Sequence, residues 1–317
     1  VPEELCGLQV TDIDSEIARY ENIIRTSIDP RITGLEIGKV PLTSSPSPAV
    51  IIIRVGRSWR QPHRIIGSRR FHARNANGNY EMDMNQIRAA FAMSETTFDR
   101  IKDFRRHRTE EIMAGEAPVS LPDGPLLVVH LVPLDAFKAE ISFSTASLEA
   151  AVPPGELNRP RPNFDGHLRS SHREQNAWQY LQLFRNGIVE FVDATHFGVQ
   201  DGVSLIRPRY EELVIEKVTT YLQALRRLGV LPPIVIMLSL LRIRDYRLRV
   251  SGMHSWSDDV RPIEKENLLL PNALIESFDV DLRQALRPLF EMIWNACGLP
   301  HSLNYDDQGR WTGLASR

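Results

Sequence analysis

The side chains best suited to chemistry with phosphate lie in one basic and aromatic block near the start of the chain. From Ile37 to Tyr80 the sequence has no Asp or Glu, although eight Lys and Arg residues fall within that stretch. Arginine can donate two parallel N–H groups to phosphate oxygens, and aromatic rings can stack on bases. The block therefore predicts a surface that binds nucleic acid, with candidate contacts at Arg54, Arg57, Trp59, Arg60, His63, Arg64, Arg69, Arg70, His72 and Arg74.

Another interpretation of the same block is a solvated face whose arginines pair with acids from distant parts of the sequence. A place in the hydrophobic core is the alternative for Trp59 and Phe71. The net charge of -2 does not separate these interpretations, because a near-neutral chain can still carry a local basic surface.

The elements expected around the block explain how it would present its charges. Residues 69–75 alternate, which places Arg70, His72 and Arg74 on one face of a strand, about 6.5 to 7 Å apart in succession. This separation is close to that of successive phosphates along one strand of nucleic acid. Arg54 and Arg57, at the end of the apolar strand 49–55, are expected to widen the surface, with Trp59 as its floor.

The remaining periodicities predict an α+β fold with two domains. A Pro- and Gly-containing segment, 117–125, is the expected boundary, giving a first domain at 1–115 and a second mixed α+β domain at 116–317. Asn186-Gly187 predicts a hairpin across 178–192 in the second domain. Helices are expected at 12–28, 83–91, 94–114, 210–228 and 281–296, and further strands at 34–40, 80–82, 126–132 and 234–250, the last as one bent strand or two.

Motifs for catalysis or metal binding are missing from the sequence. There is no phosphate-binding glycine loop, no HExxH and no paired CxxC, and the histidines at 172, 196, 254 and 301 are scattered. We therefore assign no catalytic and no metal-binding residue. Helix 94–114 has matched numbers of acids and bases and is expected to be a surface helix with many ion pairs. Cys6 and Cys297 form no CxxC pair, and we expect both to be reduced thiols. No apolar run is long enough to span a membrane. Together these observations lead us to expect a cytoplasmic protein.

Most of the chain resembles one family in order along the sequence. The run IIIRVGRSWRQPHRI, followed by RRFHARNANGNYEMDMNQIRAAF, resembles the later part of the AlbA_2 domain, a Schlafen-like DNA-binding domain of bacterial proteins described as ATP-binding. TDIDSEIARYENIIRTSIDPRI before that run also fits, as do FDRIKDFRRHR, GPLLVVHLVPLDAF and YLQLFRNGIVEF after it.

The resemblance implies a truncated AlbA_2 domain as the first domain. The family's EFK-type and AFAN..GG motifs, whose region forms a metal-dependent RNase site in animal Schlafens, do not occur here. No catalytic residue can therefore be carried over, and ATP is not expected as a cofactor. A divalent metal is implied only if the upstream carboxylates exist in the natural protein; a binding-only member of the family is the alternative. Strand 49–55 would then expose an edge that pairs with another chain or forms a homo-oligomer.

Three functions follow as hypotheses. The first is a nucleic-acid-binding Schlafen-like protein that forms part of a metal-dependent endoribonuclease acting on tRNA or other RNA in bacterial defence against phage. The second is a non-catalytic DNA-binding regulator that uses the same basic block. The third is a nucleotide-sensing interaction module. RNA and DNA remain open at this point.

Overall fold

The structure is a computed structural model, which describes residues 7–8, 12–32, 35–42, 49–55, 58, 60–75, 78–137, 141–155, 157–173, 175–250 and 260–313. Its helices and mostly antiparallel sheets make an α+β fold, as the sequence predicts. The chain divides into two compact units, Val1–Asp99 and Arg100–Arg317, so that residues 100–115 group with the second unit rather than with the first. No helix in the described part of the chain is long and apolar enough to cross a membrane.

The described residues of the first unit form two separate small sheets. One has four antiparallel strands in the order β1 (Ile28–Asp29), β4 (Arg64–Ile65), β5 (Arg70–Asn75) and β6 (Gly78–Glu81). The other is a ribbon of β2 (Leu35–Pro41) and β3 (Ala49–Val55). Helix α1 (Ile13–Ser27) precedes both, and the side chain of Asp12 caps it by accepting the backbone N–H groups of Asp14 and Ser15. The bounds of β2, β3, β5 and β6 agree closely with the predicted strands, whereas the two-residue strands β1 and β4 were not predicted.

The ribbon leaves much apolar surface in contact with solvent. Strand β3 pairs with β2 along its whole length, and its other edge makes a single bridge, between Ala49 and Leu8, among the described residues. Ile52, Ile53 and Val55 are between 44% and 51% exposed. Helix α1 has no buried residue. The first unit therefore buries little apolar surface per residue in the part of the chain that the structure describes.

Helix α2 (Met84–Met113) is one continuous helix where the sequence predicts two. No Gly or Pro occurs between positions 84 and 113, so no residue there forces the helix to end. Ser94, which indicated a new N-cap, lies inside the helix instead. The helix begins as expected at Asp83, whose carboxylate accepts the N–H of Gln86 at 2.8 Å while the Gln86 side chain accepts the N–H of Asp83 at 3.0 Å. This reciprocal pair is a capping box.

The second unit is built on a large antiparallel sheet. Its strand order is β16 (Leu268–Leu269), β14 (Ile234–Leu241), β7 (Leu126–Pro133), β11 (Val189–Asp193), β10 (Asn176–Phe184), β9 (Gly166–Arg173) and β8 (Arg159–Pro162); β17 (Ala273–Ile275) also pairs with β14. The hairpin of β10 and β11 forms across Asn186-Gly187, as predicted, and Gly187 has a φ of 83°.

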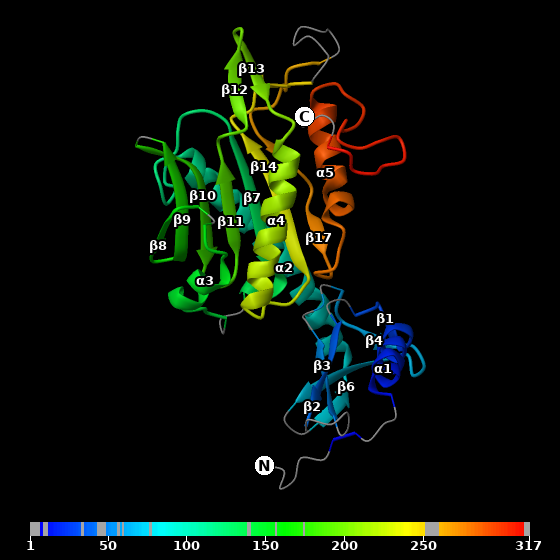
Figure 1. Cartoon of the computed structure of the whole chain (residues 1–317). Coiled ribbons are helices and arrows are strands. Elements are labelled where there is room, and N and C mark those ends of the chain that lie inside the picture. Colours follow the sequence, from blue (N-terminus) through cyan, green and yellow to red (C-terminus); the bar gives the residue numbers. More distant parts are fainter. Residues whose placement is uncertain are drawn as a thin grey trace. The chain divides into compact units, whose positions relative to one another are not determined.

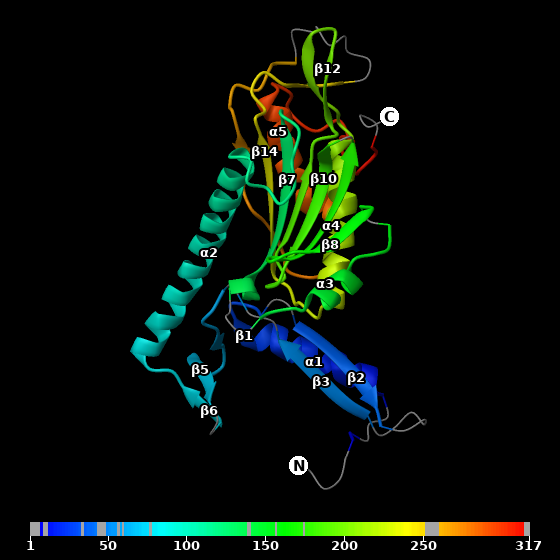
Figure 2. The same cartoon turned by 90° about the vertical axis from the view of Figure 1, so that its left-hand side faces the viewer.

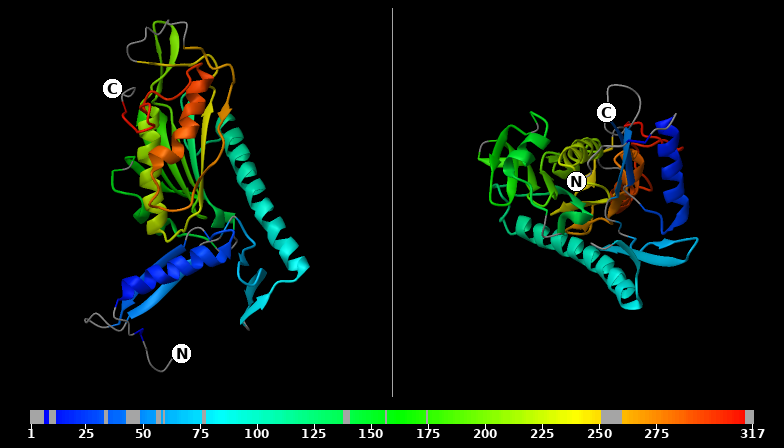
Figure 3. Two further views of the ribbon diagram at one scale, coloured as in Figure 1. Left: turned by 90° about the vertical axis from the view of Figure 1, so that its right-hand side faces the viewer. Right: turned by 90° about the horizontal axis from the view of Figure 1, so that it is seen from below.

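Helices cover both faces of this sheet (Figures 1 and 3). Helices α4 (Tyr210–Arg227) and α5 (Leu282–Ala296) contribute to the core on one face, together with the short helix α3 (Thr145–Ala151). The later part of α2 lies along the opposite face (Figure 2), where Ile112 packs with Leu126 and Val128. Alternate residues of β7 and β11 enter the two cores, which explains why both strands are buried at every position.

A small three-stranded sheet stands at one end of the second unit. It consists of β12 (Phe197–Gln200), β13 (Val203–Ile206) and β15 (Arg247–Leu248). The segment expected as one bent strand or two at 234–250 is therefore two strands in two different sheets. The 3-10 helix at Leu134–Phe137 follows β7 and completes the described elements.

Candidate nucleic-acid interface

Strand β5 presents its basic residues as the sequence predicts. Arg70, His72 and Arg74 are exposed, whereas Phe71 and Ala73 between them are half-buried. The strand pairs with β6 on one side, where His72 faces Glu81 and Arg74 faces Asn79, and with β4 on the other. The predicted alternation is confirmed, and Phe71 belongs to the covered side of the strand.

Acidic residues from outside the acid-free stretch pair with several of its arginines. Arg70 contacts Glu81 at 2.7 Å, and Arg64 contacts Asp29 at 2.8 Å. All four side chains are about half exposed, so each pair contributes little to folding stability, ~0 to 1 kcal/mol. The pairs matter more for binding, because each arginine now has an acid to compete with a phosphate.

The other candidates lie in different places. Arg54 is on β3, which pairs with β2 and not with β5, so it is not a cross-strand neighbour that widens the β5 surface; Glu36 lies 4.0 Å from it. Arg60 is exposed and its N–H donates to Ser58. The Nδ1 atom of His63 lies 2.5 Å from the carbonyl oxygen of Pro30, and this side chain is half-buried. Arg57 and Trp59 lie outside the described residues.

Two arginines of the block have no acidic partner among the described residues. Arg74 ends the exposed row on β5, and Arg69 directly precedes that strand in the left-handed region, with a φ of 60°. Both are exposed. Together with His72 they form the part of the block that is available to an anion, and we call Arg69, His72 and Arg74 the β5 cation row.

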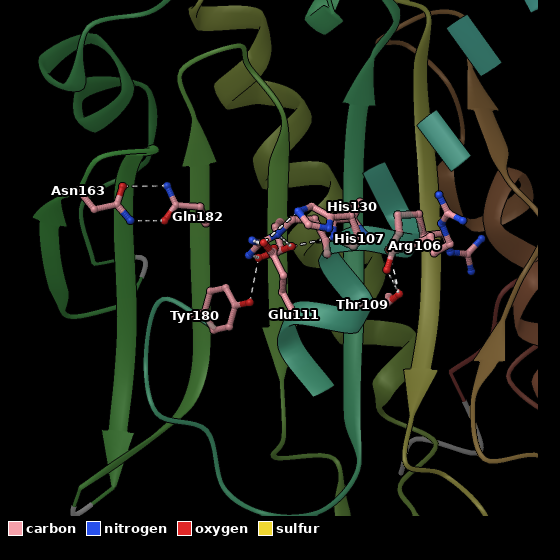
Figure 4. A network of polar contacts seen from close by, with 11 residues as sticks. Arg106, His107, Thr109, Glu111, His130, Asn163, Tyr180 and Gln182 are labelled. Carbon is pink, nitrogen blue, oxygen red and sulfur yellow. Dashed lines mark hydrogen bonds and ion pairs between the residues drawn. The ribbon is translucent and has the colours of Figure 1, made fainter. Parts of the chain in front are cut away.

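A buried polar network in the second unit was missed by the sequence analysis (Figure 4). Glu190 on β11 accepts two hydrogen bonds from Arg108, at 2.9 and 2.7 Å, and one from the hydroxyl of Tyr180 at 2.8 Å. The Nε2 atom of His130 on β7 lies 2.9 Å from the same carboxylate. Glu190, His130 and Tyr180 are completely buried. The sequence did contain a signal for this network, because Glu190 lies within the apolar run IVEFV and His130 within the apolar run LLVVHLVP.

The electrostatics of this network favour an ionised pair. Burial alone would raise the pKa of Glu190, but the hydrogen bonds and charges of Arg108 and His130 outweigh burial and lower it to about 2. Burial and the charge of Glu190 together raise the pKa of Tyr180 well above its ordinary value. Arg108 also contacts Glu111, which in turn lies 3.1 Å from the exposed His107. The network holds α2 on the sheet rather than facing a ligand.

Helix α2 carries ion pairs of the expected kind on its exposed side, but two of its arginines, Arg105 and Arg108, point to the sheet instead of to solvent. Arg105 is buried and donates to the carbonyl oxygens of Leu270 and Leu238, at 2.6 and 2.9 Å, and to the hydroxyl of Ser239 at 3.2 Å. Burial lowers the pKa of Arg105 to about 10. Arg106 and Asp103, by contrast, form an exposed pair of the expected kind.

A second buried carboxylate, Glu211, is held by neutral donors. The indole N–H of Trp294 donates to it at 2.5 Å, and the Ser302 hydroxyl and the Asn304 amide donate at 2.9 and 3.0 Å. The hydroxyl of Tyr210 lies 3.3 Å away. Burial raises the pKa of Glu211 to about 7, against the opposing effect of these hydrogen bonds. The cluster ties the first turn of α4 to α5 and to the segment that follows it.

His196 has a partner that the sequence analysis did not assign. Its Nδ1 lies 2.9 Å from the buried carboxylate of Asp193, which also accepts the Thr195 hydroxyl at 2.6 Å and the Gln179 amide at 2.7 Å. Burial would raise the pKa of Asp193, but these three partners together hold it below its ordinary value. The spacing of three residues between Asp193 and His196 was visible in the sequence as DATH.

No group of three or more His, Cys, Asp or Glu side chains suited to a metal ion occurs among the described residues. Cys297 is buried with a free thiol, and burial raises its pKa to about 11; Cys6 lies outside the described residues. The exposed arginines of the β5 cation row offer N–H donors of the kind that bind anions.

Comparison with family models, with curated proteins and with solved structures found no match to this chain. The resemblance to the AlbA_2 domain therefore stays a prediction.

Proposed function

We propose that this protein binds nucleic acid through phosphate contacts made by the β5 cation row. The observation that carries the proposal is the exposure of Arg69 and Arg74 with no acidic partner among the described residues. Arg74 belongs to the outward row of β5, whose side chains are spaced like phosphates, and Arg69 directly precedes the strand. Such contacts supply affinity without reading sequence. A part in a nuclease would need catalytic carboxylates, and none is assigned in this chain, so the proposal is one of binding alone.

The affinity of the Arg69→Ala, Arg74→Ala double variant is expected to depend less on salt than that of the wild type. Each phosphate contact contributes about -0.9 to the slope of log K against log salt concentration, so losing both should reduce the slope by about 2. Fluorescence anisotropy with a labelled mixed-sequence duplex DNA and a single-stranded RNA, between about 50 and 200 mM salt, measures this. The matched control is Arg19→Ala with Arg25→Ala in α1, which removes two arginines that are paired with Glu16 and Glu21.

An unchanged slope in the β5 double variant, or an equal change in the α1 control, would refute the proposal. The first result would mean that these arginines do not touch phosphate, and the second that only net charge matters. Competition between the DNA and RNA probes then identifies the nucleic acid.

The Glu81→Gln variant should bind more tightly than the wild type. Glu81 neutralises Arg70 at 2.7 Å and faces His72 across the strand pair, so its removal frees one cation and withdraws one repelling anion. The salt slope should become steeper by up to about 1. Glu21→Gln removes the same charge beside Arg25 in α1 and should leave binding unchanged. Weaker binding by Glu81→Gln would show that the pair positions the strand instead of competing with phosphate.

A further inference from the structure

Two arginines directly follow the ends of neighbouring strands in the small sheet of the second unit. In the parallel pairing of β13 with β15, Leu205 lies beside Arg247 and Ile206 beside Leu248. The next residues are Arg207 and Arg249, and the N–H of Arg249 donates to the carbonyl oxygen of Ile206 at 2.9 Å. Both side chains are exposed, and both line one cavity of about 190 Å³ together with Gly198, Val199, Gln200 and Leu205.

Among the described residues, no acidic side chain compensates the charges in this cavity. Like charges on neighbouring strand positions destabilise a sheet. The described residues that line the cavity include no carboxylate, and neither arginine forms an ion pair with another described residue. The polar contact of the Arg207 guanidinium is a long one, 3.5 Å to the carbonyl oxygen of Thr195. An anion bound between the two guanidinium groups would remove this repulsion.

A glycine, Gly198, lines the cavity close to Arg207. Gly198 faces Leu205 across the β12–β13 pair, and a Cβ atom at this position would lie 3.7 Å from the Arg207 guanidinium. The φ of Gly198 is outside the left-handed region, so the backbone does not require glycine there. Glycine leaves this position of the cavity lining without a side chain beside the Arg207 guanidinium.

We propose that Arg207 and Arg249 bind a phosphoryl group in this cavity. Arginine pairs bind phosphate in preference to weaker acceptors because their fixed N–H groups match its oxygens. A volume of about 190 Å³ suits a phosphate group better than a whole drug-sized ligand, for which pockets of ~300 Å³ or more are usual. The group would be a free phosphate, the phosphate of a mononucleotide or the terminal phosphate of a nucleic acid. The site lies in the second unit and is independent of the β5 cation row.

Calorimetric titration of the full chain with inorganic phosphate at low salt tests the site. Arg207→Gln and Arg249→Gln should each weaken phosphate binding at least about tenfold, because each removes charge-assisted hydrogen bonds. Gly198→Val keeps both arginines and should weaken binding similarly by occupying the cavity. Arg244→Gln is the control, since Arg244 is exposed and paired with Glu266 at 3.5 Å. Circular dichroism checks that each variant is folded.

Absence of saturable phosphate binding by the wild type in the millimolar range would overturn the proposal. So would equal affinities in the wild type and the two glutamine variants. Adenosine monophosphate and a pair of oligonucleotides with 5′-phosphate or 5′-hydroxyl ends identify the source of the phosphoryl group. Preference for the phosphorylated oligonucleotide assigns the site to the end of a nucleic acid. Equal binding of adenosine monophosphate and phosphate, without that preference, assigns the site to a small ligand. Phosphate binding should be unchanged in the Arg69→Ala, Arg74→Ala variant.

Discussion

Replacing Glu190 with Gln is expected to lower the free energy of unfolding by about 3 kcal/mol or more. The carboxylate is completely buried and holds Arg108, whose side chain is 13% exposed. Gln keeps the shape but removes the negative charge, and removing one member of a buried ion pair typically costs about 3 to 5 kcal/mol because the other charge stays buried. Urea denaturation monitored by circular dichroism measures the change.

Asp103→Asn is the control for this variant, because it removes one negative charge from the exposed Arg106–Asp103 pair on the same helix. It should alter the free energy of unfolding by no more than about 0.5 kcal/mol. A double variant, Arg108→Met with Glu190→Met, should recover much of the lost stability, since an apolar replacement of both partners is often neutral. Losses that simply add in the double variant would contradict the assignment of a coupled pair.

Glu211 should make the free energy of unfolding of the wild type fall as the pH rises. An ordinary ion-paired carboxylate has the opposite effect, because its pKa is lowered by folding. The folded pKa is about 7 and the usual value is 4.5, so the folded state binds the proton more tightly than the unfolded state. The stabilisation that comes from this tighter proton binding is therefore complete below pH 4.5 and is lost as the pH rises through about 7. The loss is on the order of 3 kcal/mol, from about 1.36 kcal/mol per pKa unit.

Comparison of unfolding free energies at about pH 5 and about pH 8 in the wild type and in Glu211→Gln isolates this effect. The difference between the two proteins should depend on pH, because the glutamine amide of the variant cannot titrate while all other groups are shared. Glu212→Gln, which changes an exposed carboxylate paired with Arg209, should leave the pH dependence as it is in the wild type. A Glu211→Gln variant that keeps the full wild-type slope would show that other groups cause it.

Local signals predicted the long helices and many of the strands, because alternation and turn residues act over a few positions. Strands β8, β9, β12 and β13 were not predicted. The β10–β11 hairpin follows from Asn186-Gly187, and the outward face of β5 follows from alternation alone. The single helix α2 was missed because Ser94 is a good N-cap residue but does not by itself end a helix.

Partners from distant positions could not be predicted in the same way. Arg64 pairs with Asp29, and Arg108 with Glu190, and nothing in the sequence around either arginine indicates those acids. The acid-free stretch therefore overstated the free positive charge of the first unit. Arg207 and Arg249 were not grouped because they meet only through a parallel strand pair.

The two-sided burial of β11 also determines which strand pairings the sequence permits. Moving β11 by one residue against its neighbours would turn Glu190 toward the apolar core of α4 and α5 and would place Phe191 beside Arg108. Such a misaligned sheet would bury an unpaired carboxylate and an unpaired guanidinium at once. We therefore expect the Arg108–Glu190 pair to disfavour wrong registers during folding, a role in specificity that is separate from its net contribution to stability.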